Sequence, residues 1–144
     1  MATPLTLYVP IKQDQLSQAA AAYAQENFVQ NVKAGLDASG IVHYARLSLI
    51  PNPSGSGTLG ILLDTVFDGP MNPYLDYFWQ NDGTKTAFQG IAAIALHAPE
   101  PPVTDQTGFE NFIDKNNLNK KATDLYQAYA LTVEMIVGSP EAGE

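Results

Sequence analysis

Near its start the chain has a segment in which apolar and polar side chains alternate, as in a strand that buries one face. Over residues 5–11 the apolar positions are Leu5, Leu7, Val9 and Ile11. Residues 42–50 and 58–68 alternate in the same way, and a loop rich in Pro, Ser and Gly joins them. This short link predicts that the second and third strands form an antiparallel hairpin.

Between the first and second strands, apolar residues recur every four positions, which is the spacing of one helix face. Asp14 stands where the N-cap of this helix is expected, and Gly40 stands at its exit. Further helices are predicted after Asn72, which is a good cap, and over residues 84–96 and 109–116. We expect these helices to cover one side of the sheet.

The segment from about residue 125 to residue 136 is ambiguous, because its Ala and Leu content also suits a helix. We expect a strand there, since the segment is rich in β-forming residues. These are Tyr126, Tyr129, Thr132, Val133 and Ile136. Residues 138–144 are small and acidic and should form a flexible tail. The chain is therefore predicted to be a single domain, residues 1–144, with a core over residues 5–137.

The predicted order is strand, helix, strand, strand, helices, strand. It is the βαββαβ order of a ferredoxin-like α+β sandwich, with extra helices before the last strand. Helices on one side leave the other sheet face bare, and that face would carry apolar and aromatic side chains. They are Tyr8, Tyr44, Leu62 and Val66. A second copy of the chain is the simplest cover, so we expect a homodimer through the open sheet face.

Composition narrows the possible partners and chemistry. The 144 residues include no cysteine, which excludes disulfides, thiol catalysis and cysteine-based metal sites and fits a cytoplasmic location. The formal net charge of −8 disfavours nucleic acid and anionic lipid surfaces as partners. No apolar run reaches the ~20 residues that span a membrane, and residues 1–4 lack the basic region of a secretory signal.

Two charged residues lie inside otherwise apolar strands, Arg46 in the second and Asp64 in the third. If Ile50 lies opposite Thr58, Asp64 faces Tyr44. Arg46 is then a diagonal neighbour of Asp64, and a register shifted by two residues is also possible. The two charges form either a cavity pair that orients an anionic or enolic substrate, or a structural bridge within the sheet or across the dimer.

Tyr8, Tyr44 and Ser48 are expected on the same face as this charged pair, and together the five residues form the predicted ligand-binding set. The tyrosines line either an aromatic pocket or a contact between protomers. Asp64 and Asp68 lie four residues apart on one side of the strand, but they lack a third ligand, so no metal site is predicted.

The two histidines are the remaining candidates. To act as a general base or a haem ligand, His43 would need a partner that fixes its ring. By alternation it points with Ala45 and Leu47 towards the helices and away from Arg46, which favours a structural role. His97 ends a predicted helix, where a cation interacts favourably with the helix terminus, and is the other candidate haem ligand.

Residues 42–47 (VHYARL), 62–69 (LLDTVFDG) and 74–76 (YLD) resemble a largely uncharacterised ferredoxin-like family of the dimeric α+β barrel superfamily. Residues 126–129 (YQAY) fit the final strand of that group. The resemblance implies that two protomers appose their open sheet faces. Members of the superfamily include cofactor-free monooxygenases that act on aromatic polyketides, haem proteins, muconolactone isomerases and small-molecule sensors, so the fold does not select one activity.

The function predicted from the sequence is binding of a small organic molecule, without a cofactor, in a cavity of the dimer. The enzyme alternative is a cofactor-independent monooxygenase or isomerase that acts on an aromatic or enolic substrate. In that alternative Arg46 holds the oxyanion, and Tyr44 or Asp64 transfers a proton. A haem-binding protein and a structural or regulatory dimer without a ligand are the further alternatives.

Overall fold

The computed structural model describes residues 2–119 and 125–138 of the chain. Its elements, in chain order, are β1 (Ala2–Pro10), α1 (Gln15–Ser39), β2 (Val42–Pro51), β3 (Thr58–Asp68), α2 (Met71–Gln80), α3 (Asp82–Ile94), α4 (Gln106–Asn116) and α5 (Val133–Val137). The three strands form one antiparallel sheet in the order β1-β3-β2. The α+β class is therefore confirmed.

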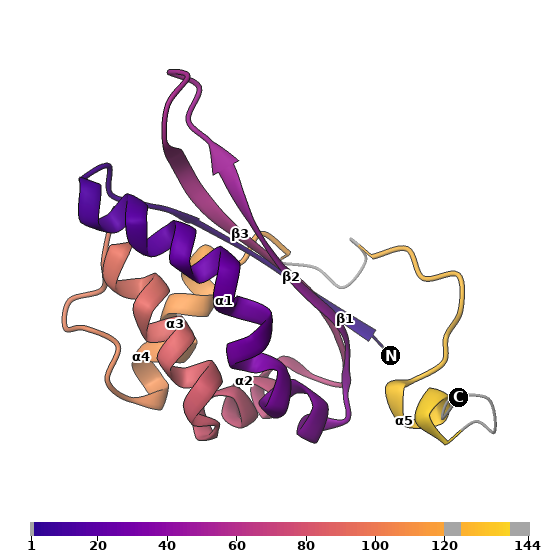
Figure 1. The fold of residues 1–144 in the computed structure, drawn as a ribbon. Helices are drawn as coiled ribbons and strands as arrows, with labels where there is room; N and C mark the ends of the chain where they lie inside the picture. Colours follow the sequence, from indigo (N-terminus) through magenta and orange to yellow (C-terminus); the bar gives the residue numbers. More distant parts are fainter. Residues whose placement is uncertain (1, 120–124, 139–144) are drawn as a thin grey trace.

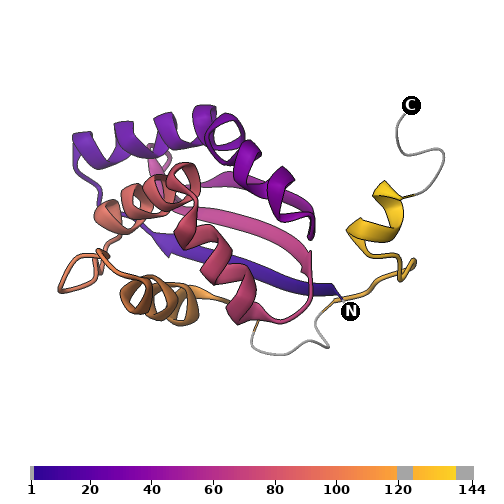
Figure 2. The ribbon, with the colours of Figure 1, turned by 90° about the horizontal axis from the view of Figure 1, so that it is seen from below.

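Helices α1 to α4 gather on one side of the sheet, whereas α5 lies apart from them, beyond the end of the sheet where β1 starts (Figures 1 and 2). The predicted alternation over residues 5–11 is confirmed, because Leu5, Leu7, Val9 and Ile11 are all buried in the core. In β3 the buried Phe67 ring stacks on Tyr74 of α2, with ring centroids 3.7 Å apart. The helix-covered face of the sheet is thus the hydrophobic core.

Local capping positions the helices that form this layer. The Asp14 carboxyl accepts hydrogen bonds from the hydroxyl and from the backbone N of Ser17, and these two bonds lower the pKa of the carboxyl below its usual 3.8. Gly40 ends α1 with a φ of 68°, the left-handed conformation that glycine adopts most readily. Both predicted ends of α1 are confirmed. The cap expected at Asn72 is wrong, because α2 begins at Met71 and Pro70 precedes it.

The predicted final strand is wrong. Residues 125–132 have no regular secondary structure, and residues 133–137 are the short helix α5. The outer edge of β1, where a further strand would pair, instead meets two loops. Thr6 O accepts a hydrogen bond from Leu118 N, and Pro10 O accepts one from Leu96 N, both at 2.8 Å.

Prolines explain why this edge of β1 takes isolated contacts instead of a full ladder. The backbone groups of Pro4 and Pro10 point outwards along with those of Thr6, because these residues are separated by two and by four positions on one strand. Proline has no N–H, so these two positions cannot donate to a neighbouring strand. The ferredoxin-like sandwich and the dimeric barrel remain predictions, and residues 139–144 of the expected tail lie outside the described residues.

Candidate functional site

Strand pairing arranges the side chains of the open sheet face in rows that cross β1, β3 and β2. In that strand order the central rows are Tyr8–Leu62–Ser48, Thr6–Asp64–Arg46 and Pro4–Val66–Tyr44. Ile50 lies opposite Gly60, so the register is the one shifted by two residues from the pairing considered first. All five residues of the predicted ligand-binding set therefore lie on one face, and Arg46 lies directly opposite Asp64.

Arg46 and Asp64 form an ion pair across β2 and β3. Nη2 of Arg46 lies 3.2 Å from Oδ2 of Asp64, and Nε donates to the same oxygen at 3.3 Å. The Arg46 side chain is 72% exposed and that of Asp64 is 20% exposed. In the single chain the guanidinium is solvated, and its donors are accessible to an anionic ligand or to a second protomer.

Tyr44 lies one row from this pair, and its chemistry is set by its surroundings. Burial raises the pKa of the Tyr44 phenol above 10.0, and the Asp64 carboxylate raises it further, while Arg46 opposes the shift. The hydroxyl therefore stays protonated at neutral pH. Tyr44 is suited to donate a hydrogen bond to a bound oxygen and is a poor general base.

On the other side of the charged pair, Tyr8 covers the backbone of β3. A Cβ atom on Gly60 would lie 2.6 Å from Cε1 of the Tyr8 ring, so the ring rests on a position that only glycine allows. Tyr8, Leu62 and Ser48 are half-buried and form a continuous row beside Arg46. This end of the open face is a mostly apolar floor with one hydroxyl on each outer strand.

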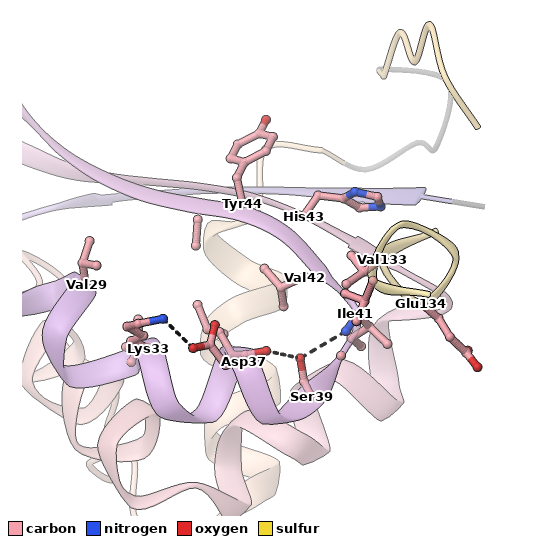
Figure 3. Close-up of a pocket in the computed structure, with 15 residues that line it drawn as sticks. Val29, Lys33, Asp37, Ser39, Ile41, Val42, His43, Tyr44, Val133 and Glu134 are labelled. Atoms are coloured by element: carbon pink, nitrogen blue, oxygen red, sulfur yellow. Dashed lines mark hydrogen bonds and ion pairs between the residues drawn. The ribbon is translucent and has the colours of Figure 1, made fainter. Parts of the chain in front are cut away.

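The prediction that His43 points towards the helices is wrong. Val42 pairs with Phe67 and Tyr44 pairs with Val66, so His43 is an extra residue in a β-bulge. In Figure 3, Val42 points towards α1, whereas Tyr44 points away from it and the His43 ring lies on the Tyr44 side of the strand. The bulge has therefore turned the histidine to the open side.

In this orientation His43 contacts Asp68, a partner that can fix the imidazole ring and that the sequence pattern did not reveal. Its Nε2 lies 2.7 Å from Oδ1 of Asp68, at the end of β3. The other carboxylate oxygen, Oδ2, accepts a hydrogen bond from the backbone N of Val133 at 2.6 Å. The His43 and Asp68 side chains are only 18% and 12% exposed. The two residues are 25 positions apart, and only the alternation of Asp68 with Asp64 could have placed it on this face.

Two hollows meet at His43 and Tyr44. The first, of about 530 Å³, is called here the open-face hollow. Its sheet side is His43, Tyr44 and Val66, and its other side is formed by Leu125, Tyr126, Gln127, Ala128, Tyr129, Leu131 and Ile136. The second, of about 880 Å³, is the α1–α5 groove between α1, β2 and α5, drawn in Figure 3. The open-face hollow thus brings aromatic residues of the C-terminal segment against the sheet.

His97, the other candidate haem ligand, is exposed in the turn that follows α3. Two positions before it, Ala95 pairs with Ile11, which directly follows β1. His43 of β2 lies beside Asp68, and Asp68 pairs with Ala2 at the start of β1. The structure places the two histidines at opposite ends of the sheet, so they cannot hold one haem iron together within a protomer. Over the described ranges, no cluster of three His, Asp, Glu or Cys side chains could hold a metal ion.

Within residues 2–119 and 125–138, no helix combines the length and the apolar content that crossing a bilayer requires. When the chain is compared with protein-family models, with curated proteins and with solved structures, nothing matches. The resemblance to the dimeric α+β barrel superfamily stays a prediction, and the geometry of the open sheet face is the basis for a function.

Proposed function

We propose that this protein binds a small organic molecule on the open face of its sheet, in a cavity that a second copy of the chain completes. The open-face hollow carries this proposal. It has an apolar floor at Val66, an aromatic wall, and hydrogen-bonding side chains that include His43 and Tyr44 on the sheet and Gln127 on the C-terminal segment. Ligand sites in proteins typically have this composition, mostly apolar with a few directed polar groups.

The polar groups on this face indicate the class of ligand. The Arg46 guanidinium is a planar donor suited to a carboxylate or an enolate oxygen, and its exposure leaves it accessible. The Tyr44 hydroxyl lies one row closer to the hollow and remains a donor. An aromatic or enolic molecule with one anionic oxygen would place its ring against Val66 and the tyrosines and its oxygen towards these donors.

A second copy accounts for the apolar surface that remains. The C-terminal segment exposes several large apolar side chains, and Tyr126 and Tyr129 are 88% and 82% exposed. These tyrosines continue the apolar surface of the open face, where Tyr44 is also exposed. A contiguous patch of this kind is unusual on a monomer. Pairing of two open faces would cover it, and a contact of about 800 Å² per protomer is the usual size.

Filling the hollow tests the binding proposal. Val66→Phe should occupy the floor of the open-face hollow, whereas Leu96→Phe enlarges an exposed side chain in the turn after α3. We expect salicylate, 2-naphthol or indole-3-acetate to raise the melting temperature of the wild-type protein and of Leu96→Phe but not of Val66→Phe. If all three proteins respond alike, or none responds to any of the compounds, the open-face hollow is not a binding site.

Sedimentation tests the second copy. We expect the wild-type chain to sediment as a dimer at micromolar concentration and Leu62→Lys, with a charge at the centre of the open face, to sediment as a monomer. Leu16→Lys, on an exposed helix position, is the matched control and should remain dimeric. A wild-type chain that sediments as a single copy at every concentration would contradict this part of the proposal.

A further inference from the structure

We propose that His43, oriented by Asp68, is a general base that takes a proton from a carbon acid bound in the open-face hollow. This inference rests on the proposed function, because it assigns chemistry to the same binding site. The reaction class is proton abstraction next to a carbonyl group, and the residues that carry it are His43 and Asp68, which the β-bulge brings into contact.

The hydrogen bonds around Asp68 fix the proton on the imidazole. Asp68 accepts from Val133 N through Oδ2 and lies 2.7 Å from His43 Nε2 through Oδ1. A carboxylate held in this way accepts, so Nε2 carries the hydrogen and Nδ1 is the basic nitrogen. Among the residues that the structure describes, Nδ1 has no hydrogen-bond partner. The ring is therefore held in the tautomer that leaves a lone pair for a ligand.

The bulge gives His43 its access. A regular strand would have placed the ring against the helices, in the core, while the extra residue places it where the open-face hollow and the α1–α5 groove meet. The charged groups that line these hollows around the ring come from different elements. Glu134 of α5 and the Lys33–Asp37 pair of α1, at 2.5 Å, line the α1–α5 groove, and Asp68 of β3, which lines neither hollow, contacts the ring directly.

The proposed step needs no oxidant and no cofactor. The C–H bond next to the carbonyl breaks, its proton moves to Nδ1 of His43, and its electron pair moves into the carbonyl group to give an enolate. The enolate oxygen accepts a hydrogen bond from the Tyr44 hydroxyl, with Arg46 one row further along the face. Return of the proton from Nδ1 to the other end of the enolate completes an isomerisation, and His43 regains its starting state.

The competing explanation is that Asp68 only anchors the C-terminal segment. Both roles use the same contacts, so a loss of stability cannot separate them. The position of the imidazole hydrogen can separate the two roles. In Asp68→Asn, the amide Oδ1 accepts from Val133 N and the amide N–H donates to His43 Nε2. That substitution keeps both contacts but moves the imidazole hydrogen to Nδ1, which removes the free base. Asp68 is thus a positioning residue whose effect is seen in the tautomer.

The test uses 5-nitrobenzisoxazole, a small aromatic carbon acid whose ring opens when a base removes its C–H proton, as the N–O bond breaks to give a coloured phenolate. We expect the full chain to accelerate this reaction above the rate in buffer alone. His43→Gln should lower the rate constant by about 100-fold or more, and Asp68→Asn by at least about tenfold. His97→Gln, at the exposed turn, is the matched control and should behave as wild type.

Nitrogen-15 spectra of the imidazole rings give the second measurement. The wild-type His43 ring should show the hydrogen on Nε2 and the ring in Asp68→Asn should show it on Nδ1. The inference is overturned if the wild-type hydrogen is on Nδ1, if the rate equals the buffer rate, or if His43→Gln keeps the rate. Salicylate that still raises the melting temperature of a protein without this activity would leave the binding proposal standing. Loss of both responses would remove both proposals.

Discussion

The two faces of the sheet differ in what fixes their side chains. On the helix-covered face, Phe67, Leu63 and their neighbours are held by close packing, and Thr65 is the one polar side chain in the middle of β3. On the open face, Arg46 and Tyr44 are exposed, and position is set by ion pairs and hydrogen bonds. One face of the sheet is therefore closed by packing, whereas the other leaves polar side chains accessible to solvent.

The largest expected effect comes from the helix-covered face. Phe67→Ala removes a fully buried ring that stacks on Tyr74 and should lower the free energy of unfolding by about 3–5 kcal/mol. Leu62→Ala, on the open face of the same strand, should cost clearly less in the single chain because Leu62 is only half-buried. Urea unfolding measures both, and equal losses would mean that the two faces are packed alike.

The next effect concerns the hydroxyl of Thr65. Its Oγ1 donates to Tyr44 O at 2.8 Å and lies 3.2 Å from the Tyr74 hydroxyl. Thr65→Val leaves both groups without this partner and should lower the free energy of unfolding by about 1–3 kcal/mol. Thr65→Ser keeps the hydroxyl, so it should lose less than Thr65→Val. A valine variant as stable as wild type would show that this contact does not contribute.

Alkaline titration compares a tyrosine from each face. Burial raises the pKa of Tyr74, and burial followed by the Asp64 charge raises that of Tyr44. In the unfolded chain both phenols ionise near pH 10, so the stability that their burial gives is complete below that pH and is lost as pH rises above it. Phenolate absorbance should show Tyr44 ionising in the folded protein at a lower pH than Tyr74. The lower-pH step assigned to Tyr44 should be missing from the titration curve of Tyr44→Phe. If the curves of Tyr44→Phe and the wild-type protein are the same, that assignment is wrong.

The smallest effect is expected from Arg46→Ala. Because the guanidinium is largely solvated, its ion pair with Asp64 should contribute no more than about 1 kcal/mol to the free energy of unfolding. Lys33→Ala, which removes an exposed ion pair on α1, is the matched control. If Arg46→Ala unfolds the protein, the pair is a structural bridge. If it folds normally but its melting temperature no longer responds to salicylate, the role of Arg46 in binding is supported.

The predictions that succeeded depend on residues close together in the sequence. The alternation over residues 5–11, the hairpin and the cap at Asp14 follow from short-range periodicity and from local hydrogen bonds. The final strand failed for the opposite reason. Its residues prefer the β conformation, but a strand also needs a sheet edge with free backbone groups. The prolines of β1 remove donors from that edge, and the loops after α3 and α4 already bond to its carbonyl groups.

The site was predicted only in part. The sequence places Tyr8, Tyr44, Ser48, Arg46 and Asp64 on one face because strand alternation is local. It misplaced His43, since a single bulged residue reverses the direction of the side chain and leaves no mark in the pattern. The contact of His43 with Asp68 joins two strands whose register the loop length does not determine.

The amino-acid pattern alone was enough for the α+β class, for the buried side chains of β1, and for placing Arg46 and Asp64 on the same face of the sheet. Periodicity and side-chain chemistry suffice for these, because they act over a few residues. Only the tertiary structure decided the register, the direction of His43 and the position of the C-terminal segment against Val66. These features depend on contacts between residues that are distant in the sequence. The free energy that favours one arrangement is a small difference between large opposing contributions, and a local sequence pattern does not reveal it.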